Sequence, residues 1–577
     1  MSKKLLTIVS LLILASLVLS ACGTKVKEGT VATGDVVSYT AWDTSDIPSL
    51  DPQLAEDVTS INAIESLFVH LTNYDLVTAD IVPEAATEWS VSEDGLTYTF
   101  TVRTDIPWVK HNPETGEVKQ EVDADGNPRF VTANDFVYGM KRACDPNLAS
   151  YYSTVIAPLI KGCNEVLNAE DPENIPQADI DAIAVSAPDD GTLVIELSGP
   201  ASYFLSMTPM WTLTATPQWS IEADGEEWTE AGNIVTNGRY VLNVWEHGVS
   251  RTFLRNPLMP EDMQGSGNID KMTYNVVPDS ATGYALWLNN EVDVSAIPSG
   301  ELQAHLENFS DETIQVPDLA VFYIAYRMTK APFDDVHVRR AFGAAFDSQT
   351  YVTELYQGQG LPMKHFAPPG IFGAPPIDEI GVGFDPEFAK QELALAGYPD
   401  CEGFPQVTLL GYTGEQTLAL IEFAQANWER VLGCSADLIQ IEQQSFADLL
   451  TATLADDAES PHMWTLGWGP DYADENNWVG DVLYCDNTVR MKRECNETDE
   501  LIDAARFEAD PEVRKELYSQ IEDNFFGYEG EYPFFPQYVR IAFQAEHSWL
   551  DRIPALFGGE QYYNWSVDWD AKQAAMQ

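Results

Sequence analysis

The chain has 577 residues and a formal net charge of −60, from 91 Asp and Glu against 31 Lys and Arg. A chain of this length exceeds one compact core, so two or three domains are expected. Such a negative field repels nucleic acid and anionic lipid, which disfavours a phosphate-binding role. The acidic residues are spread along the chain, as is typical of a solvated acidic surface.

The N-terminus has the three parts of a secretory signal: a basic start at 1–4, an apolar run at 5–20, and small residues directly before Cys22. Small residues in that place resemble a bacterial lipobox. The resemblance implies a lipoprotein signal peptide over 1–21 and lipid modification of Cys22. The alternative is an ordinary signal peptide or an N-terminal membrane helix. The polar, glycine-rich segment 22–35 predicts a flexible tether.

Strands and helices are mixed along the rest of the chain. Alternating apolar and polar residues predict half-buried strands at 98–108 and 191–197. The sequence DADGNP at 123–128 predicts a hairpin turn, and it lacks the ligand spacing of a calcium loop. Helical signals occur at 132–143, 335–347, 385–397 and 511–526. The first has Thr132 or Asn134 near its cap, and the third starts with Asp385 before Pro386 and stops at Gly397. This mixture, without the regular alternation of a TIM barrel, predicts an α/β architecture.

Six cysteines remain besides Cys22, an even number, which predicts disulfides in an exported protein. Fifteen connectivities are possible. Pairing of sequence neighbours closes three short loops and is favoured: Cys144 with Cys163, Cys401 with Cys434, and Cys485 with Cys495. The chain has no C-x₂-C pair that would favour a zinc site.

Five longer motifs follow one another along the chain. They are SLDPQ (49–53), VPEAATEWSVSEDGLTYTFTVRTDIPW (82–108), NGRYVLNVWEHGVSRTFLRNP (237–257), APFDDVHVRRAFGAAFD (331–347) and FDPEFAKQELALAGYPD (384–400). In order and number they resemble the motifs of ABC-importer solute-binding proteins of the dipeptide/oligopeptide family, bacterial extracellular solute-binding protein family 5. The resemblance extends from about residue 36 to the C-terminus, with Arg239 where the family usually has proline.

The resemblance implies a periplasmic-binding-protein-like α/β fold of two lobes and an additional inserted domain, with a ligand cleft between the lobes. Two hinge strands, near 305–320 and 528–540, would join the lobes. The implied boundaries are a discontinuous first lobe of 36–76, 204–310 and 536–577, an inserted domain of 77–203, and a second lobe of 311–535.

The resemblance also implies a ligand site. In the family's peptide binders a G-W-x-x-D segment lies in the cleft, and its Asp pairs with the peptide's α-amino group. The matching carboxylate here is Asp471, at the end of GWGPD. Trp468 would form an apolar wall beside it. Gly467, Trp464 and Tyr472 are the further candidates for ligand contact.

The segment after Tyr472 departs from the family pattern, because DYADENN lacks the proline of the usual D-Y-x-D-P. Asp474 and Glu475 are therefore interpreted as acids of a solvated turn. A partner for a ligand carboxylate is not evident. Arg327 and Arg339 are the cations in the second-lobe half, and Arg339 is expected to be structural.

The implied function is that of a lipid-anchored, extracytoplasmic receptor that delivers a solute, with a peptide as the first expectation, to an ABC importer permease with separate ATPase subunits. It would be a monomer without cofactor, metal or nucleic-acid partner. Relatives that carry oligosaccharides, opines or metal chelates define the alternative solutes. A secreted hydrolase is the alternative class, but no G-x-S-x-G, H-E-x-x-H or P-loop pattern occurs.

Overall fold

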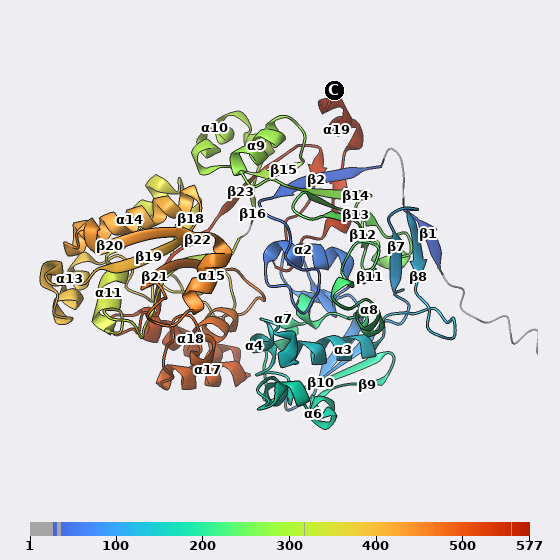
Figure 1. Ribbon diagram of the computed structural model, residues 1–577, viewed down its shortest axis with the longest axis horizontal. Helices are drawn as coiled ribbons and strands as arrows, with labels where there is room; N and C mark the ends of the chain where they lie inside the picture. Colours follow the sequence, from blue (N-terminus) through green and yellow to red (C-terminus); the bar gives the residue numbers. More distant parts are fainter. Residues whose placement is uncertain (1–26, 32–35, 317, 556) are drawn as a thin grey trace, which may run out of the picture.

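The computed structural model describes residues 27–31, 36–316, 318–555 and 557–577, arranged as two lobes side by side (Figure 1). The predicted signal peptide and Cys22 lie outside the described residues. Within the described residues, no helix combines the length and the apolar character needed to cross a membrane.

The first lobe contains a four-stranded sheet of strand order β12-β13-β14-β2. Its strands are β12 (Tyr240–Glu246), β13 (Ser250–Arg255), β14 (Lys271–Val276) and β2 (Ser38–Asp43). Helix α2 (Val58–Leu67) packs beside this sheet. The helix begins at Asp57, whose side chain accepts a hydrogen bond of 2.9 Å from the backbone nitrogen of Ser60. Such a cap satisfies an amide that has no partner inside the helix.

A second sheet of the same lobe comes from the predicted inserted segment and has the order β5-β6-β10-β9. Its strands are β5 (Ala86–Val91), β6 (Thr97–Val102), β10 (Thr192–Glu196) and β9 (Val185–Asp189). Helix α3 (Ala133–Ala143) covers it. Phe100 faces Leu193 in the register, and both are fully buried. The alternation of residues therefore predicted β10 correctly, whereas the strand expected at 98–108 ends at Val102. The core of this sheet is continuous with that of the first sheet.

The predicted turn at 123–128 is present, but it does not join two long strands. The backbone nitrogen of Asp123 donates to the carbonyl of Asn127 at 2.9 Å, and Gly126 has a φ of 84°. Beyond the turn only an isolated bridge joins Val122 to Pro128. Proline has no amide hydrogen to extend a ladder, which explains the short pairing. The hairpin strands of this region lie just before the turn: β7 (Val109–Asn112) and β8 (Glu117–Gln120).

The second lobe is built on a six-stranded sheet of order β18-β22-β17-β21-β19-β20. The strands are β18 (Gly360–Pro362), β22 (Phe534–Arg540), β17 (Val321–Tyr326), β21 (Met463–Trp468), β19 (Val407–Tyr412) and β20 (Ile439–Gln444). The longer helices of the lobe are α11 (Val336–Ala344), α13 (Pro386–Leu395), α14 (Glu415–Leu432), α15 (Phe446–Leu454), α17 (Glu497–Phe507) and α18 (Pro511–Phe526). Three of them, α11, α13 and α18, confirm the predicted helices of this half.

Two connections lead from one lobe to the other. Strands β15 (Val294–Ala296), β23 (Ala542–Glu546) and β16 (Thr313–Val316) form a three-stranded sheet. The chain leaves this sheet from β16 to β17 and returns to it from β22 to β23 (Figure 1). This pairing favours lobe crossings at those two connections. The boundaries given from the sequence stay a prediction.

The lobes also touch through side chains near the inserted segment. The ring of Tyr203, just before helix α7 (Phe204–Met207), stacks on the ring of Tyr472 with centroids 5.8 Å apart. The guanidinium of Arg514 in α18 donates to the hydroxyl of Ser202. The two lobes are therefore in contact in this structure.

The three disulfides predicted from the sequence order are present. They join Cys144 to Cys163, Cys401 to Cys434, and Cys485 to Cys495. The first lies in the inserted segment and the other two in the second lobe.

Candidate functional site

Strand β21 carries the G-W-x-x-D segment to the edge of the interlobe contact. All six of its residues pair with β17 on one side. On the other side only Met463 and Trp464 pair with β19. The last four residues therefore have no strand partner along that edge among the described residues. At Gly467 an added Cβ would lie 3.0 Å from the ring of Phe322, so the strand packs tightly at this point.

Asp471 follows this strand and is held from both lobes. Its Oδ1 accepts a hydrogen bond of 2.8 Å from the hydroxyl of Tyr152, which precedes helix α4 (Ser153–Ile156) of the inserted segment. Its Oδ2 accepts one of 3.1 Å from Nδ2 of Asn477. The backbone nitrogen of Asp471 donates to Oδ1 of the same Asn477 at 2.9 Å. The carboxylate is thus oriented, yet it forms no ion pair with any residue that the structure describes.

Burial dominates the electrostatics of this carboxylate. Loss of water raises the pKa of Asp471 to about 7, although the hydrogen bonds from Asn477 and Tyr152 oppose the rise. A carboxylate without a cation in such surroundings is costly to ionise. A positively charged ligand group in contact with it would supply the missing partner.

The two tryptophans of β21 differ in what they can contact. Trp468 is half-buried at the end of the strand, and its indole nitrogen donates to Oδ1 of Asn477 at 3.4 Å. It can therefore present an apolar face beside Asp471. Trp464 is 1% exposed inside the core of the second lobe. Its side chain is thus enclosed in this structure, and its role in ligand contact stays a prediction.

Tyr472 is enclosed where the two lobes meet. It is fully buried, its hydroxyl donates to Oδ2 of Asp481 at 2.6 Å, and its ring stacks on Tyr203 of the opposite lobe. Its ring belongs to the core cluster of the first lobe. Tyr472 therefore contributes to the contact between the lobes, and its contact with a ligand stays a prediction.

Asp474 and Glu475 do not lie in a solvated turn. Asp474 is 3% exposed, pairs with the guanidinium of Arg514, and accepts a hydrogen bond of 3.1 Å from the hydroxyl of Tyr518. Burial raises the pKa of Asp474 to about 6. Glu475 is fully enclosed, and burial followed by the charge of Glu522 raises its pKa well above the usual value. Asp474 thus anchors the loop to α18, whereas the carboxylate oxygens of Glu475 have no hydrogen-bond partner among the described residues.

Neither arginine named from the sequence can meet a ligand carboxylate. Arg327 is fully buried and donates to the Asp457 carboxylate at 2.7 Å and to backbone carbonyls. Arg339 is 5% exposed and donates to the carbonyls of Glu531 and Phe333 at 2.9 and 2.7 Å. Arg339 is structural, as expected, and so is Arg327.

The site includes two residues that the sequence did not indicate, Tyr152 and Asn477. Tyr152 lies 319 residues before Asp471 along the chain, so no local pattern connects them. Asn477 is fully buried beneath the loop and contacts both Trp468 and Asp471. Its place in a run of polar residues gave no signal of burial.

Metal ligation has little support among the described residues. The group Cys485, Asp486 and Cys495 is compact, but both sulfurs form a disulfide and offer no thiolate. His462, near the site in sequence, accepts a hydrogen bond of 3.1 Å from the backbone nitrogen of Thr408. A cavity of about 130 Å³ in the first lobe contains none of the five predicted ligand residues.

The chain passes twice between two lobes of mixed strands and helices, and the lobes meet at an oriented carboxylate. This arrangement is typical of a solute-binding protein. The family model "Bacterial extracellular solute-binding proteins, family 5 Middle" matches residues 80–489, more than half of the chain. The chain belongs to this family. Membership confirms the predicted fold class, an extracytoplasmic location and a binding protein rather than an enzyme.

Individual relatives match most of the chain. The periplasmic oligopeptide-binding protein OppA of Escherichia coli (strain K12) is 29% identical over 446 residues, 76% of each chain. The oligopeptide-binding protein OppA of Bacillus subtilis (strain 168) is 27% identical, and the match includes 97% of this chain and 99% of that protein. The solved structure of OppAIV from Borrelia burgdorferi superposes with a TM-score of 0.78 at 22% identity, covering 92% of this chain and all of that one. At that identity it shows the fold alone.

Proposed function

We propose that the protein is a receptor for peptides and that Asp471 binds the ligand's amino group. The observation that carries the proposal is a half-buried carboxylate at the interlobe contact, oriented by Tyr152 and Asn477 and lacking a cation among the described residues. An ammonium group supplies the positive charge and several donors together. The relatives from E. coli and B. subtilis, named as oligopeptide-binding proteins, support the same ligand class.

The free edge of β21 supports a peptide over other amines. The last residues of the strand, up to Trp468, leave backbone groups without a strand partner beside Asp471. A peptide backbone can add to such an edge as a further strand, and side-chain specificity then comes from the neighbouring pockets. Gly467 and Trp468 are the residues that we assign to this contact.

The rest of the proposal concerns delivery. Cys22 carries the lipid that anchors the receptor to the membrane, and the protein acts as a monomer. It passes its ligand to an ABC importer permease with separate ATPase subunits. The first lobe, the inserted domain and the second lobe keep the boundaries expected from the sequence.

Calorimetry with the purified protein tests the assignment. A peptide with a free amino group should bind, and N-acetylation should weaken it. Asp471→Ala should cost the unmodified peptide about 2–5 kcal/mol, the range for removing one partner of a buried charge pair. The exposed Asp486 provides the control, since Asp486→Ala should leave affinity unchanged. Equal affinity of the wild type and Asp471→Ala would overturn the role of Asp471, and failure of a peptide library to bind would overturn the function.

A further inference from the structure

A cavity of about 130 Å³ lies in the first lobe, between helix α2 and the sheet beside it. The helix lines it with Val58, Thr59, Asn62, Ala63 and Ser66. These positions share one face of α2, because residues three and four apart in a helix are neighbours on its surface. Val58 is 71% exposed, so the cavity reaches the surface of the protein at the first turn of α2.

The opposite wall comes from the sheet and contains a buried arginine. Arg251 of β13 and Tyr274 of β14 are cross-strand partners, and Asp43 is the last residue of β2. Arg251 is 3% exposed, and its Nη2 pairs with Oδ2 of Asp43. Its guanidinium lies over the ring of Tyr274, 4.6 Å from the centroid. Contacts on two sides therefore hold the charged group of Arg251 in place.

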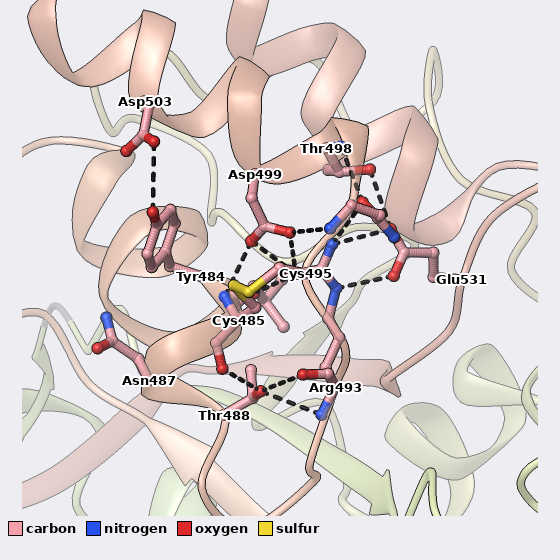
Figure 2. Close-up of polar contacts among 12 residues, drawn as sticks. Tyr484, Cys485, Asn487, Thr488, Arg493, Cys495, Thr498, Asp499, Asp503 and Glu531 are labelled. Atoms are coloured by element: carbon pink, nitrogen blue, oxygen red, sulfur yellow. Dashed lines mark hydrogen bonds and ion pairs between the residues drawn. A yellow bond between two sulfur atoms is a disulfide. The ribbon is translucent and has the colours of Figure 1, made fainter.

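Two nitrogens of this guanidinium have no partner. Nε and Nη1 of Arg251 are buried and donate to no atom of the described chain. Arg493, in the 485–495 loop that a disulfide closes, differs in this respect (Figure 2). It donates to Asp499 at 2.7 and 2.8 Å, to Glu531 at 2.7 and 3.1 Å, and to Asn496 at 2.9 Å. Because a buried charged donor without a hydrogen bond is costly, the free nitrogens of Arg251 indicate a ligand that accepts from them.

The cavity also offers hydrogen-bond acceptors. Oδ2 of Asp43 accepts from Arg251, but Oδ1 accepts from no residue that the structure describes. Burial raises the pKa of Asp43, although the charge of Arg251 and its hydrogen bond oppose the rise. The side chains of Asn62 and Thr59 form no hydrogen bond within the described residues, and they add an amide and a hydroxyl to the wall. A ligand here therefore meets a cation, an anion and neutral polar groups together.

This combination favours a small zwitterion. Arg251 and Asp43 form a neutral pair, so an anion or a cation alone would leave a net charge in a buried site. The net charge of −60 also repels free anions. An α-amino acid brings one charge of each sign. Its size is suitable as well, since a cavity of about 150 Å³ holds benzene, which has as many non-hydrogen atoms as alanine.

We propose that this cavity is a second ligand site, for a small free α-amino acid, separate from the site at Asp471. The ligand's carboxylate accepts from Nη1 of Arg251, and its ammonium group donates to Oδ1 of Asp43. Phe253 and Ala63 supply apolar wall for a small side chain. The inference does not depend on the proposed function, because the cavity shares no residue with the site at Asp471.

Calorimetry with L-alanine, acetate and methylammonium tests the proposal. L-alanine should bind the wild type at least about tenfold more tightly than either ion, since each ion carries only one of the two charges. Arg251→Gln should weaken binding of L-alanine by at least about tenfold. Ala63→Leu keeps the ion pair but fills the cavity, so it should abolish binding even where Arg251→Gln fails to fold. The matched control is Ala304→Leu on the exposed face of α10 (Leu302–Asn308), which should bind normally.

Further arms of the experiment separate the two ligand sites. Asp471→Ala should bind L-alanine with unchanged affinity, and Ala63→Leu should still bind a peptide. Loss of L-alanine binding in Asp471→Ala but not in Ala63→Leu would place the amino acid between the lobes and overturn the inference. Equal affinity for acetate and L-alanine would show a plain anion site, and absence of binding by all three probes would show a cavity that holds only water; either result also overturns it. Failure of peptides alone to bind overturns only the proposed function.

Discussion

At the residue scale the main feature is a carboxyl group that changes charge near neutral pH. Burial places the pKa of Asp471 at about 7, above its usual range, so the free protein holds a proton there at lower pH. The folded state gains stability from this proton, and that gain is lost as the pH rises through about 7. An ammonium ligand prefers the ionised form and therefore competes with the proton.

This competition predicts how affinity depends on pH. Affinity for a free-amine peptide should reach a plateau above about pH 7 and fall by about tenfold per unit between pH 6 and 5. Calorimetry at pH 5.5 in buffers of different ionisation enthalpy should show the release of about one proton per ligand. Asp471→Asn should bind weakly with little pH dependence. A flat profile for the wild type would contradict this account.

Side-chain burial at the site was harder to predict than its charge. Asp471 could be proposed because GWGPD resembles the G-W-x-x-D segment of the family's peptide binders. The burial of Asp474 depends on Arg514, forty residues later, and the orientation of Asp471 depends on Tyr152 in another part of the chain. Trp464 and Trp468 lie on one strand, but of the two only Trp464 pairs with β19 and is enclosed in the core of the second lobe.

At the element scale the 485–495 loop depends on a buried ion-pair network. Arg493→Met should lower the free energy of unfolding by about 3–5 kcal/mol, because it leaves Asp499 and Glu531 without their cation. Lys515→Met is the matched control. Its ion pair with Glu512 is exposed, and such pairs contribute about 0–1 kcal/mol. Urea denaturation of both variants measures the difference, and equal effects would contradict the assigned role of the network.

Elements with local signals were predicted well. Helices α13 and α18 begin at Asp385 and Asp510, whose side chains cap the first amides, and each has proline in the first turn. These signals lie within a few residues of one another. The free edge of β21 could not be predicted, because it depends on where β19 ends relative to it. Pairing between distant strands leaves no trace within either strand.

At the scale of the whole molecule the dominant quantity is the net charge of −60. Repulsion among the acids opposes the compact state and is screened by salt, with a Debye length of about 30 Å at 0.01 M and 10 Å at 0.1 M. The Tm should therefore rise by about 2 °C or more between 10 and 500 mM NaCl. Scanning calorimetry measures it, with KCl expected to give the same shift. A Tm that falls over this range would contradict a repulsive surface.

The contact between the lobes across Asp471 affects how often the receptor closes without a ligand. When the receptor closes empty, its carboxylate can be neutralised only by a proton, and above about pH 7 that proton is scarce. Empty closure then carries a penalty that a ligand's ammonium removes, so the bound state closes preferentially. A permease that engages only closed receptors would therefore encounter fewer closed, empty receptors at neutral pH than at acidic pH. Fewer of its ATP-driven cycles would then proceed without a ligand.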